Sequence, residues 1–129
     1  MGLDMYAYTV EKDRFDNVVD TTEQREVFYE NKTDLFYWRK HPNLHGWMEQ
    51  HVYVDEYGGE DEFNCIPVKL DERLLDLLQC AVVNGLLPET DGFFFGKSLP
   101  EEKKTDLEFI AQARKAISAG KDVYYDSWW

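Results

Sequence analysis

The stretch YWRKHPNLHGW, residues 37–47, joins an extended segment to a helix. The residue before a proline is held away from helical backbone angles, so residues 34–40 are expected to be extended. Pro42 suits the first position of a helix, because its missing N–H would have no partner there. Gly46 lies inside this helix at a cost of roughly 1 kcal/mol relative to alanine, which indicates close packing. The spacing of the aromatic and apolar residues predicts a helix to about residue 54. Its buried face is expected to be formed by Leu44, Trp47, Met48, His51 and Val52.

The same stretch carries the local positive charge of an acidic chain. The 129 residues have a net charge of −12, yet residues 31–50 hold three bases, Lys32, Arg39 and Lys40, against two acids, Asp34 and Glu49. Fixed positive charge beside aromatic faces suits an anion on a flat ring, or a carboxylate. The competing interpretation is that the aromatics are core and the bases pair with neighbouring acids.

The remaining patterns predict an α+β fold in a single domain spanning residues 1–129. Alternation marks strands at residues 2–10 and 122–129, and we expect the last strand to lie beside the first. With residues 34–40 these strands form a small, largely antiparallel sheet against which about three helices pack. Residues 63–70 are extended, and Pro67 makes them an edge or irregular strand. Residues 11–32 are a charged excursion, either a hairpin or a short helix capped near Thr21.

Two further helices have recognisable ends. Asp71 caps the first, and Gly85 ends it in a left-handed conformation. A capping box, Ser98 to Glu101, starts the second, which stops at Gly120. The inward side chains are expected to be Leu74, Leu77, Leu78, Ala81 and Val82 in the first helix, and Leu107, Ile110, Ala111 and Ile117 in the second.

Three phenylalanines lie between Gly92 and Gly96, an unusual arrangement. Alternation sends Phe93 and Phe95 one way and Phe94 the other, so at least two rings are expected to enter the core. The glycines permit close backbone approach to another element.

Composition restricts the class of protein. No apolar run approaches the ~18 residues that a membrane span needs, and the start of the chain lacks the basic and apolar regions of a secretory signal. Cys65 and Cys80 have no CxxC spacing and are interpreted as reduced thiols of a cytosolic protein. A charge of −12 disfavours direct nucleic-acid binding, because phosphates would be repelled.

Several pieces together resemble a group of small uncharacterised proteins encoded by bacteriophages and prophages. These are GLDMY at the start, YWRKH followed by LHGW, FNC before a helix, GFFFG, and YYDSWW at the end. The likeness runs almost end to end and is weakest at residues 11–32 and 54–62. It implies a phage origin and expression in the host bacterial cytoplasm. It supplies no activity, cofactor or catalytic residue.

Catalytic chemistry has little support in the sequence. Cys65 with His41 or His45 could form a nucleophile–base pair, but a free cysteine is commonly a small buried hydrophobe. The same three residues lack zinc-ligand spacing. No motif indicates a cofactor, a metal site or a catalytic residue.

The leading hypothesis is therefore a binding module for a small anionic ligand. Its pocket would centre on Arg39 beside the first turn of the 42–54 helix, whose N–H groups and dipole favour an anion. Asp4 would hold Arg39, and His45 would donate when protonated. The candidate ligand-binding residues are Asp4, Tyr6, Trp38, Arg39, Lys40, His45, Trp47, Phe94 and Trp128. The alternatives are a phage effector that binds a host protein through acidic surfaces at residues 11–30 or 55–62, and an enzyme acting on a nucleotide-like metabolite.

Overall fold

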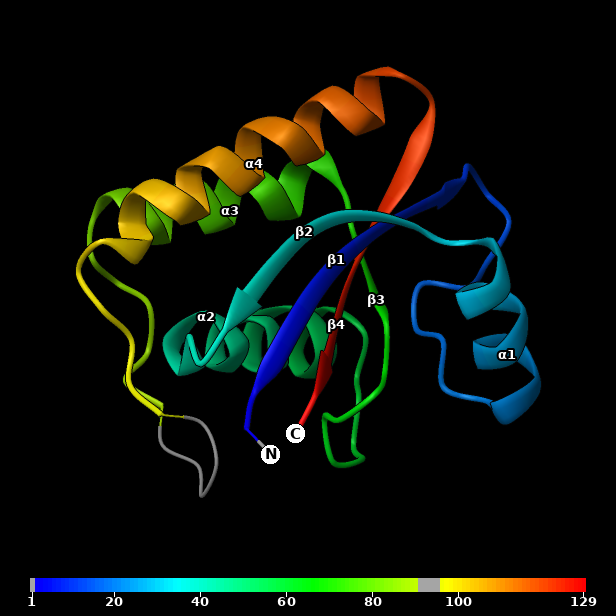
Figure 1. Cartoon of the computed structure of the whole chain (residues 1–129), viewed down its shortest axis with the longest axis horizontal. Coiled ribbons are helices and arrows are strands. Elements are labelled where there is room, and N and C mark those ends of the chain that lie inside the picture. The colour runs from blue at the N-terminus through cyan, green and yellow to red at the C-terminus, as the bar shows by residue number, and fades with distance from the viewer. Residues whose placement is uncertain (1, 91–95) are drawn as a thin grey trace.

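The computed structural model describes residues 2–90 and 96–129 and builds them around a four-stranded antiparallel sheet (Figure 1). The strands are β1 (Asp4–Glu11), β2 (Thr33–Arg39), β3 (Val68–Leu70) and β4 (Lys121–Trp128), in the spatial order β2-β1-β4-β3. The predicted α+β class is confirmed. The predicted phenylalanines between Gly92 and Gly96, Phe94 among them, lie outside the described residues.

The two terminal strands pair along their whole length at the centre of the sheet. Their register runs from Asp4 opposite Trp128 to Glu11 opposite Lys121, which confirms that the last strand lies beside the first. On its other edge β1 pairs with β2, with an irregularity between Ala7 and Tyr8. β1 and β4 have neighbouring strands on both edges, so their backbone groups are paired on both sides, and their alternating side chains point to the two faces of the sheet.

β3 is a three-residue strand at the sheet edge, as Pro67 predicted. Proline cannot donate an N–H to a ladder, but its carbonyl oxygen still accepts the N–H of Val19 at 2.9 Å. The excursion therefore runs along the outer edge of β3, where Val18 bridges Val68 and Asn17 accepts the Lys69 N–H.

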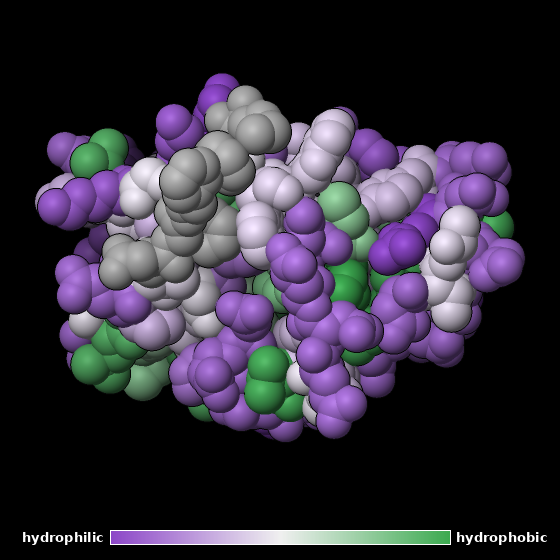
Figure 2. Space-filling view, turned by 90° about the horizontal axis from the view of Figure 1, so that it is seen from below, coloured by the Kyte–Doolittle hydropathy of each residue, from purple (hydrophilic) through white to green (hydrophobic). Residues whose placement is uncertain are grey.

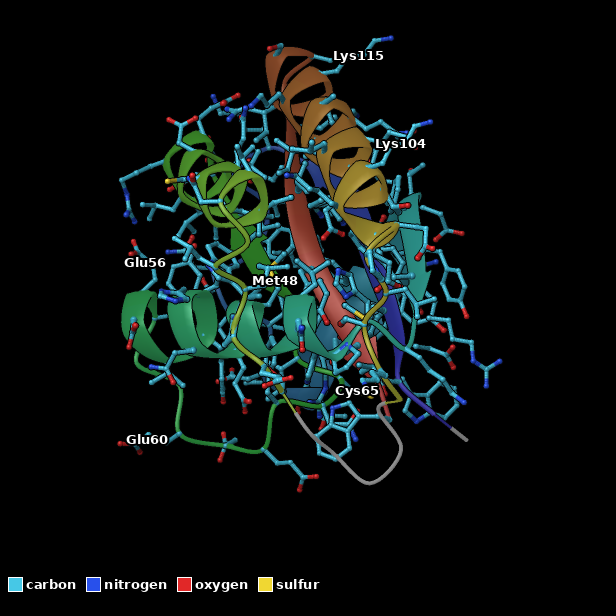
Figure 3. The ribbon with its side chains drawn as sticks, turned by 90° about the vertical axis from the view of Figure 1, so that its left-hand side faces the viewer. Met48, Glu56, Glu60, Cys65, Lys104 and Lys115 are labelled. Carbon is cyan, nitrogen blue, oxygen red and sulfur yellow. The ribbon has the colours of Figure 1, made fainter. Side chains whose placement is uncertain are left out.

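One face of the sheet carries the main core. It is covered by α2 (Pro42–Trp47), which continues into the π-helix η1 (Met48–Glu56), and by α3 (Glu72–Val83) and α4 (Glu102–Ser118). α3 and α4 lie side by side (Figure 1). Met48 starts η1 and Glu56 ends it (Figure 3). The fully buried side chains here include Leu3, Met5, Leu44, Met48, Phe63, Leu70, Leu74, Leu75, Phe109 and Tyr125.

The helix after Pro42 forms where it was predicted, but its buried face was partly wrong. Leu44, Trp47, Met48 and Val52 are buried, whereas His51 has a half-exposed side chain. The wider π turn carries residue 51 off the inner face, and Tyr53 is buried instead.

α3 confirms its predicted caps. The Asp71 carboxylate accepts the Leu74 N–H at 2.8 Å, and Gly85 has a φ of +66°. The inward position of Leu77 was wrong, since 49% of its surface is exposed and Leu75 is buried in its place. The buried side of α3 is therefore rotated about the helix axis relative to the predicted one, so that it includes Leu75 and not Leu77.

The start of α4 departs from the predicted capping box. Glu102, not Glu101, closes the first turn by accepting the Leu99 N–H at 2.9 Å. Ser98 is drawn into a tertiary contact and accepts the Asn43 N–H at 3.1 Å. Ala111 was also assigned to the wrong face.

Further along α4, the side chains that reach the core agree only in part with the prediction. Ala111 is exposed, while Phe109, Ile110 and Ala113 are buried. Leu107 and Ile117 are partly buried against the same core, as predicted.

The opposite face of the sheet is covered by α1 (Thr22–Asn31). Of the two predicted alternatives for residues 11–32, a hairpin or a short helix, the structure shows the helix. Thr21 caps it by accepting the Gln24 N–H at 3.2 Å. Phe28 inserts between the sheet and the preceding loop, with its ring centroid 5.0 Å from that of Tyr124. Val18 pairs with Val68 as an isolated bridge rather than within a hairpin.

The surface is predominantly hydrophilic. The view from below shows apolar side chains in small separated groups among polar ones (Figure 2). None of the helices in residues 2–90 and 96–129 has the length and apolar character that a membrane crossing requires.

Gly46 marks a close approach, as the sequence predicted. A Cβ at this position would lie 1.9 Å from Thr90 Oγ1 and 2.9 Å from Thr90 Cβ. We expect Gly46→Ala to lower the free energy of unfolding by about 1–3 kcal/mol, because overpacking outweighs the better helix propensity of alanine. Urea titration of the two proteins measures the difference.

A double-mutant cycle identifies the cause. In a Thr90→Gly background the opposing side chain is absent, so the same Gly46→Ala change should cost little or stabilise the helix. An equal loss in both backgrounds would contradict the contact.

Candidate functional site

The face of the sheet that carries α1 also holds a cavity of about 670 Å³, here called the Arg25 cavity. The alternation of β1 and β4 directs Tyr6, Tyr8, Asp126 and Trp128 to this face. The cavity is lined by Tyr6, Tyr8, Arg25, Tyr29, Asn64, Cys65, Asp126, Ser127 and Trp128.

Four of the nine lining residues carry aromatic rings. Tyr6 and Tyr8 are two residues apart on β1, and their rings are nearly parallel, with centroids 5.7 Å apart. Tyr29 from α1 meets Tyr8 edge-on at 6.3 Å. Trp128 is 66% exposed and borders the open side. Flat faces at this spacing provide stacking surfaces for a ring.

Asp126 provides a buried carboxyl group in the cavity wall. Its side chain accepts the Tyr29 hydroxyl at 2.5 Å on one oxygen and the Ser127 N–H at 2.9 Å on the other. Burial raises the pKa of Asp126 to about 6, and the hydrogen bonds from Tyr29 and Ser127 oppose this shift. A carboxyl group with this pKa can accept or donate a hydrogen bond near neutral pH.

Arg25 supplies the positive charge. Of the five arginines, Arg14, Arg39, Arg73 and Arg114 form ion pairs with carboxylates. Arg25 forms no such ion pair with the described residues, and its guanidinium makes one long bond, 3.4 Å, to the Cys65 carbonyl oxygen. A guanidinium has five N–H donors, so most of those of Arg25 remain for a ligand.

Cys65 holds the loop that borders the cavity, next to the end of β4 (Figure 3). Its φ of +59° is unusual for a residue with a side chain, and its N–H donates to the Ser127 carbonyl oxygen at 2.8 Å. Burial, followed by the charge of Asp126, raises the pKa of the Cys65 thiol, while Arg25 opposes the shift. A raised pKa disfavours the thiolate that a nucleophilic cysteine needs.

The structure brings only two of the sequence-predicted ligand residues, Tyr6 and Trp128, into this cavity. Asp4 does pair with Arg39, at 3.9 Å, and also accepts the Tyr37 hydroxyl at 2.7 Å. This pair lies at the surface, with 54% of the Arg39 side chain exposed. Lys40 is exposed as well.

Three other predicted residues, all of them described, belong to the core on the opposite face. Trp38, His45 and Trp47 are at most 4% exposed. Trp38 donates its indole N–H to Asp106, and the His45 Nδ1 lies 2.7 Å from the Tyr125 hydroxyl. The structure therefore does not place Arg39 in one pocket with these rings.

The first turn of α2 does not offer the anion site that the sequence suggested. The Asn43 N–H donates to Ser98 Oγ, and the His45 N–H donates to the His41 carbonyl oxygen. Burial lowers the pKa of His45 to about 4, so the imidazole is neutral at physiological pH and does not act as a charged donor.

Sequence reasoning missed Arg25, Tyr29 and Asp126. Arg25 and Tyr29 lie in the excursion whose structure was left open, and helical spacing in that segment would have placed them one turn apart on a common side. Asp126 had a visible signal, because an acid within YYDSWW is unusual in a buried strand.

Comparisons of the chain with protein-family models, curated proteins and solved structures found no match. In the described part of the chain, no three His, Cys, Asp or Glu side chains are grouped as metal ligands would be. The assignment of a function therefore depends on the geometry of the site.

The raised pKa of Asp126 predicts a pH dependence of stability. Its ordinary value is 3.8 and its folded value about 6, so the native state binds more protons than the unfolded state between these values. Stability attributable to Asp126 is then present at low pH and lost as pH rises through 6. We expect the stability of wild type relative to Asp126→Asn to fall by up to about 3 kcal/mol between about pH 4 and 7.

Urea unfolding at several pH values measures this difference. His45, whose pKa is about 4, contributes the opposite slope in both proteins, so subtraction removes it. A difference that stays constant with pH would contradict the shifted pKa.

Proposed function

We propose that this chain is a binding module for a small ligand with a flat ring and an anionic group, held in the Arg25 cavity. One observation carries the proposal: Arg25 lines an aromatic cavity, and its guanidinium makes a single long hydrogen bond and no direct ion pair with a described carboxylate. Its charge acts on Asp126 in the same cavity, and its remaining N–H donors are suited to a ligand's anion.

Each wall of the cavity has a role in this proposal. The rings of Tyr6 and Trp128 stack against the ligand ring, whereas Tyr8 is buried beneath Lys32 and supports Tyr6 from the side. Arg25 binds a phosphate or carboxylate through two parallel N–H bonds. Asp126, with its raised pKa, exchanges a hydrogen bond with a ring nitrogen or hydroxyl group.

The resemblance to bacteriophage proteins supports a related proposal about context, that the ligand is encountered in the host bacterial cytoplasm. The effector hypothesis also has a physical basis, since Asp55, Glu56 and Glu60–Glu62 form an exposed acidic stretch. Acidity alone names no partner, however, so this hypothesis enters as an outcome of the experiment.

Thermal denaturation with a panel of nucleotides and phosphorylated metabolites tests the ligand proposal. A ligand present at 100 times its Kd stabilises the folded state by about 2.7 kcal/mol, which raises the Tm by several degrees. We expect a ligand that stabilises wild type to have no effect on Arg25→Ala. Arg39→Ala is the matched control, because Arg39 is exposed and paired outside the cavity, and it should respond as wild type does.

Two results would contradict the proposal. One is a ligand that stabilises Arg25→Ala as well as wild type. The other is a panel without effect, combined with a host protein recovered from bacterial lysate by Arg25→Ala as readily as by wild type. The second result would favour the effector hypothesis.

A further inference from the structure

A second cavity, of about 280 Å³, lies on the opposite side of the sheet, where α2 meets the segment before α4. We call it the Ser98 cavity. Its apolar walls are Val82, Leu87, Leu99 and Pro100. It shares no residue with the Arg25 cavity, so any activity of the Ser98 cavity is independent of the ligand proposal.

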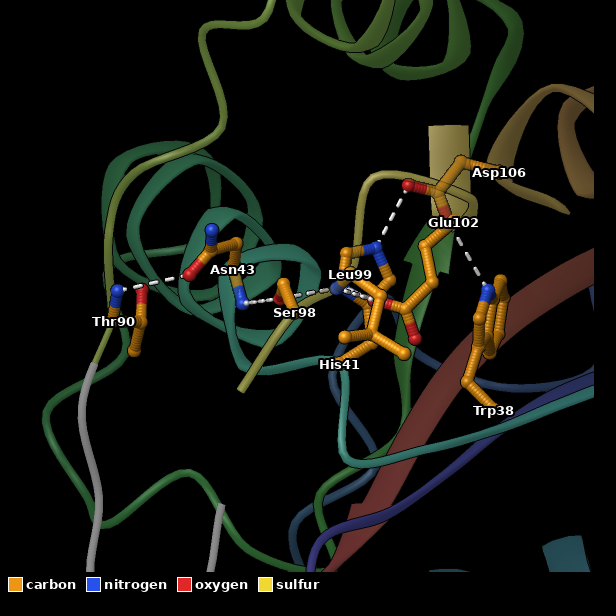
Figure 4. A network of polar contacts seen from close by, with 8 residues as sticks. All are labelled: Trp38, His41, Asn43, Thr90, Ser98, Leu99, Glu102 and Asp106. Atoms are coloured by element: carbon orange, nitrogen blue, oxygen red, sulfur yellow. Dashed lines mark hydrogen bonds and ion pairs between the residues drawn. The ribbon is translucent and has the colours of Figure 1, made fainter. Parts of the chain in front are cut away.

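Three polar side chains are arranged in series at this cavity (Figure 4). Ser98 Oγ lies 2.7 Å from His41 Nδ1, and His41 Nε2 lies 2.8 Å from Asp106 Oδ2. The second oxygen of Asp106 accepts the Trp38 indole N–H at 3.2 Å. His41 and Asp106 are 2% and 1% exposed, whereas Ser98 is partly exposed and borders the cavity.

The contact with Asp106 selects one tautomer of a neutral imidazole, in competition with Glu102 at the other ring nitrogen. Asp106 can only accept when ionised, so in this tautomer the ring proton is on Nε2 and Nδ1 is left with a lone pair. Nδ1 then accepts the Ser98 hydroxyl proton. Asn43 donates its N–H to Ser98 Oγ at 3.1 Å and so helps to orient the hydroxyl group.

We propose that Ser98, His41 and Asp106 form a hydrolytic site, with Ser98 as the nucleophile, His41 as the general base and Asp106 as the residue that orients His41. Nucleophile and base within hydrogen-bond reach, with the base held by a third group, are the geometric requirement for this chemistry. The substrate class is a small ester with a short apolar acyl group, which fits the volume and the walls of the cavity.

The reaction balances with water as the co-reactant. Ser98 Oγ bonds to the acyl carbon as His41 Nδ1 takes the hydroxyl proton, and the proton passes to the alcohol as the ester C–O bond breaks. Water then attacks the acyl-serine, losing a proton to Nδ1, and the acid leaves as Ser98 regains its proton. Asp106 stays ionised throughout and stabilises the imidazolium.

Two donors at the cavity can stabilise the negative oxygen of the intermediate. The side-chain oxygen of Asn43 accepts the Thr90 N–H at 3.1 Å, and its NH₂ group has no hydrogen bond to the described residues. Lys103 lines the same cavity, with its ammonium 3.2 Å from the Val83 carbonyl oxygen. Asn43 lies in α2 and Lys103 in α4, so helices position both donors.

Glu102 limits the activity of this site. Its Oε2 lies 3.0 Å from His41 Nδ1 and also accepts the Leu99 N–H. A carboxylate there favours a proton on Nδ1, and a protonated Nδ1 cannot accept from Ser98. Asp106, Glu102 and the cation Lys103 are the charged groups at this site, and removing the charge of Glu102 alone leaves Ser98 without a competing carboxylate at Nδ1.

Labelling with a fluorophosphonate tests the nucleophile directly. This reagent phosphonylates an activated serine, so we expect covalent addition to wild type, located at Ser98 by peptide mass spectrometry. Ser98→Ala should lose the label, and Ser118→Ala, at the exposed end of α4, should retain it. The location of the label in wild type tests Ser98 as the nucleophile even if the Ser98→Ala variant fails to fold.

Hydrolysis of p-nitrophenyl acetate and butyrate tests the base. Ser98→Ala should lose the rate above background, and His41→Ala should lower it by about 10²–10⁴-fold. Glu102→Gln, which removes the carboxylate that competes with Ser98 for Nδ1, should raise the rate. A role of Glu102 in stability alone would leave the rate of the folded protein unchanged.

Folded wild type that takes no label at Ser98 between about pH 6 and 9 would overturn the proposal, as would hydrolysis no faster than that of Ser98→Ala. Labelling at another serine would overturn it as well. Thermal melts of each variant establish that the compared proteins are folded.

Discussion

The pairing of β1 with β4 is the constraint on which the rest of the structure depends. The two strands come from opposite ends of the chain and lie at the centre of the sheet. Closing so long a loop costs conformational entropy that is recovered only when both faces are covered. Met5, Ala7 and Tyr125 are buried on one face, and Tyr8 and Tyr124 on the other. α1 is therefore a structural requirement, because it covers the second face.

The coverage of the two faces is unequal, and this inequality creates the Arg25 cavity. α2–η1, α3 and α4 cover the main face, whereas α1 is a ten-residue helix that protects only part of the other. Phe28 fills the end near Tyr124, and the end near Asp126 and Trp128 stays open. Because α1 covers only part of the paired strands β1 and β4, the aromatic side chains beyond it face a cavity rather than a core.

Buried charge on each side of the sheet is held by neutral donors as well as by partners of opposite sign. Asp126 accepts from a tyrosine hydroxyl, and Asp106 accepts from an indole N–H and approaches His41. No buried side-chain polar atom of the described residues lacks a hydrogen bond. Burying a carboxylate costs several kcal/mol even when paired, and an apolar residue would often serve stability as well. Asp106 and Asp126 therefore contribute less to stability than their number of hydrogen bonds suggests.

Local patterns in the sequence predicted much of the fold, because they depend on neighbours in the chain. The Asp71 cap, the left-handed Gly85 and the close packing of Gly46 follow from residue type and position alone. The failures came from contacts between distant segments. Ser98 is taken from its capping role by His41 and Asn43, and a π turn moves His51 outward. No local pattern contains that information.

The predicted site residues are separated in the structure for a different reason, which the sequence itself contained. Trp38 and Arg39 were assigned to one pocket, yet adjacent residues of a strand point to opposite faces of the sheet. Once residues 34–40 are extended, a pocket that holds the Trp38 ring excludes the Arg39 guanidinium. The structure places Trp38 in the core and Arg39 at the surface, consistent with that rule. The cation beside the aromatic faces of the cavity is instead Arg25, which α1 brings over the sheet from a separate part of the chain.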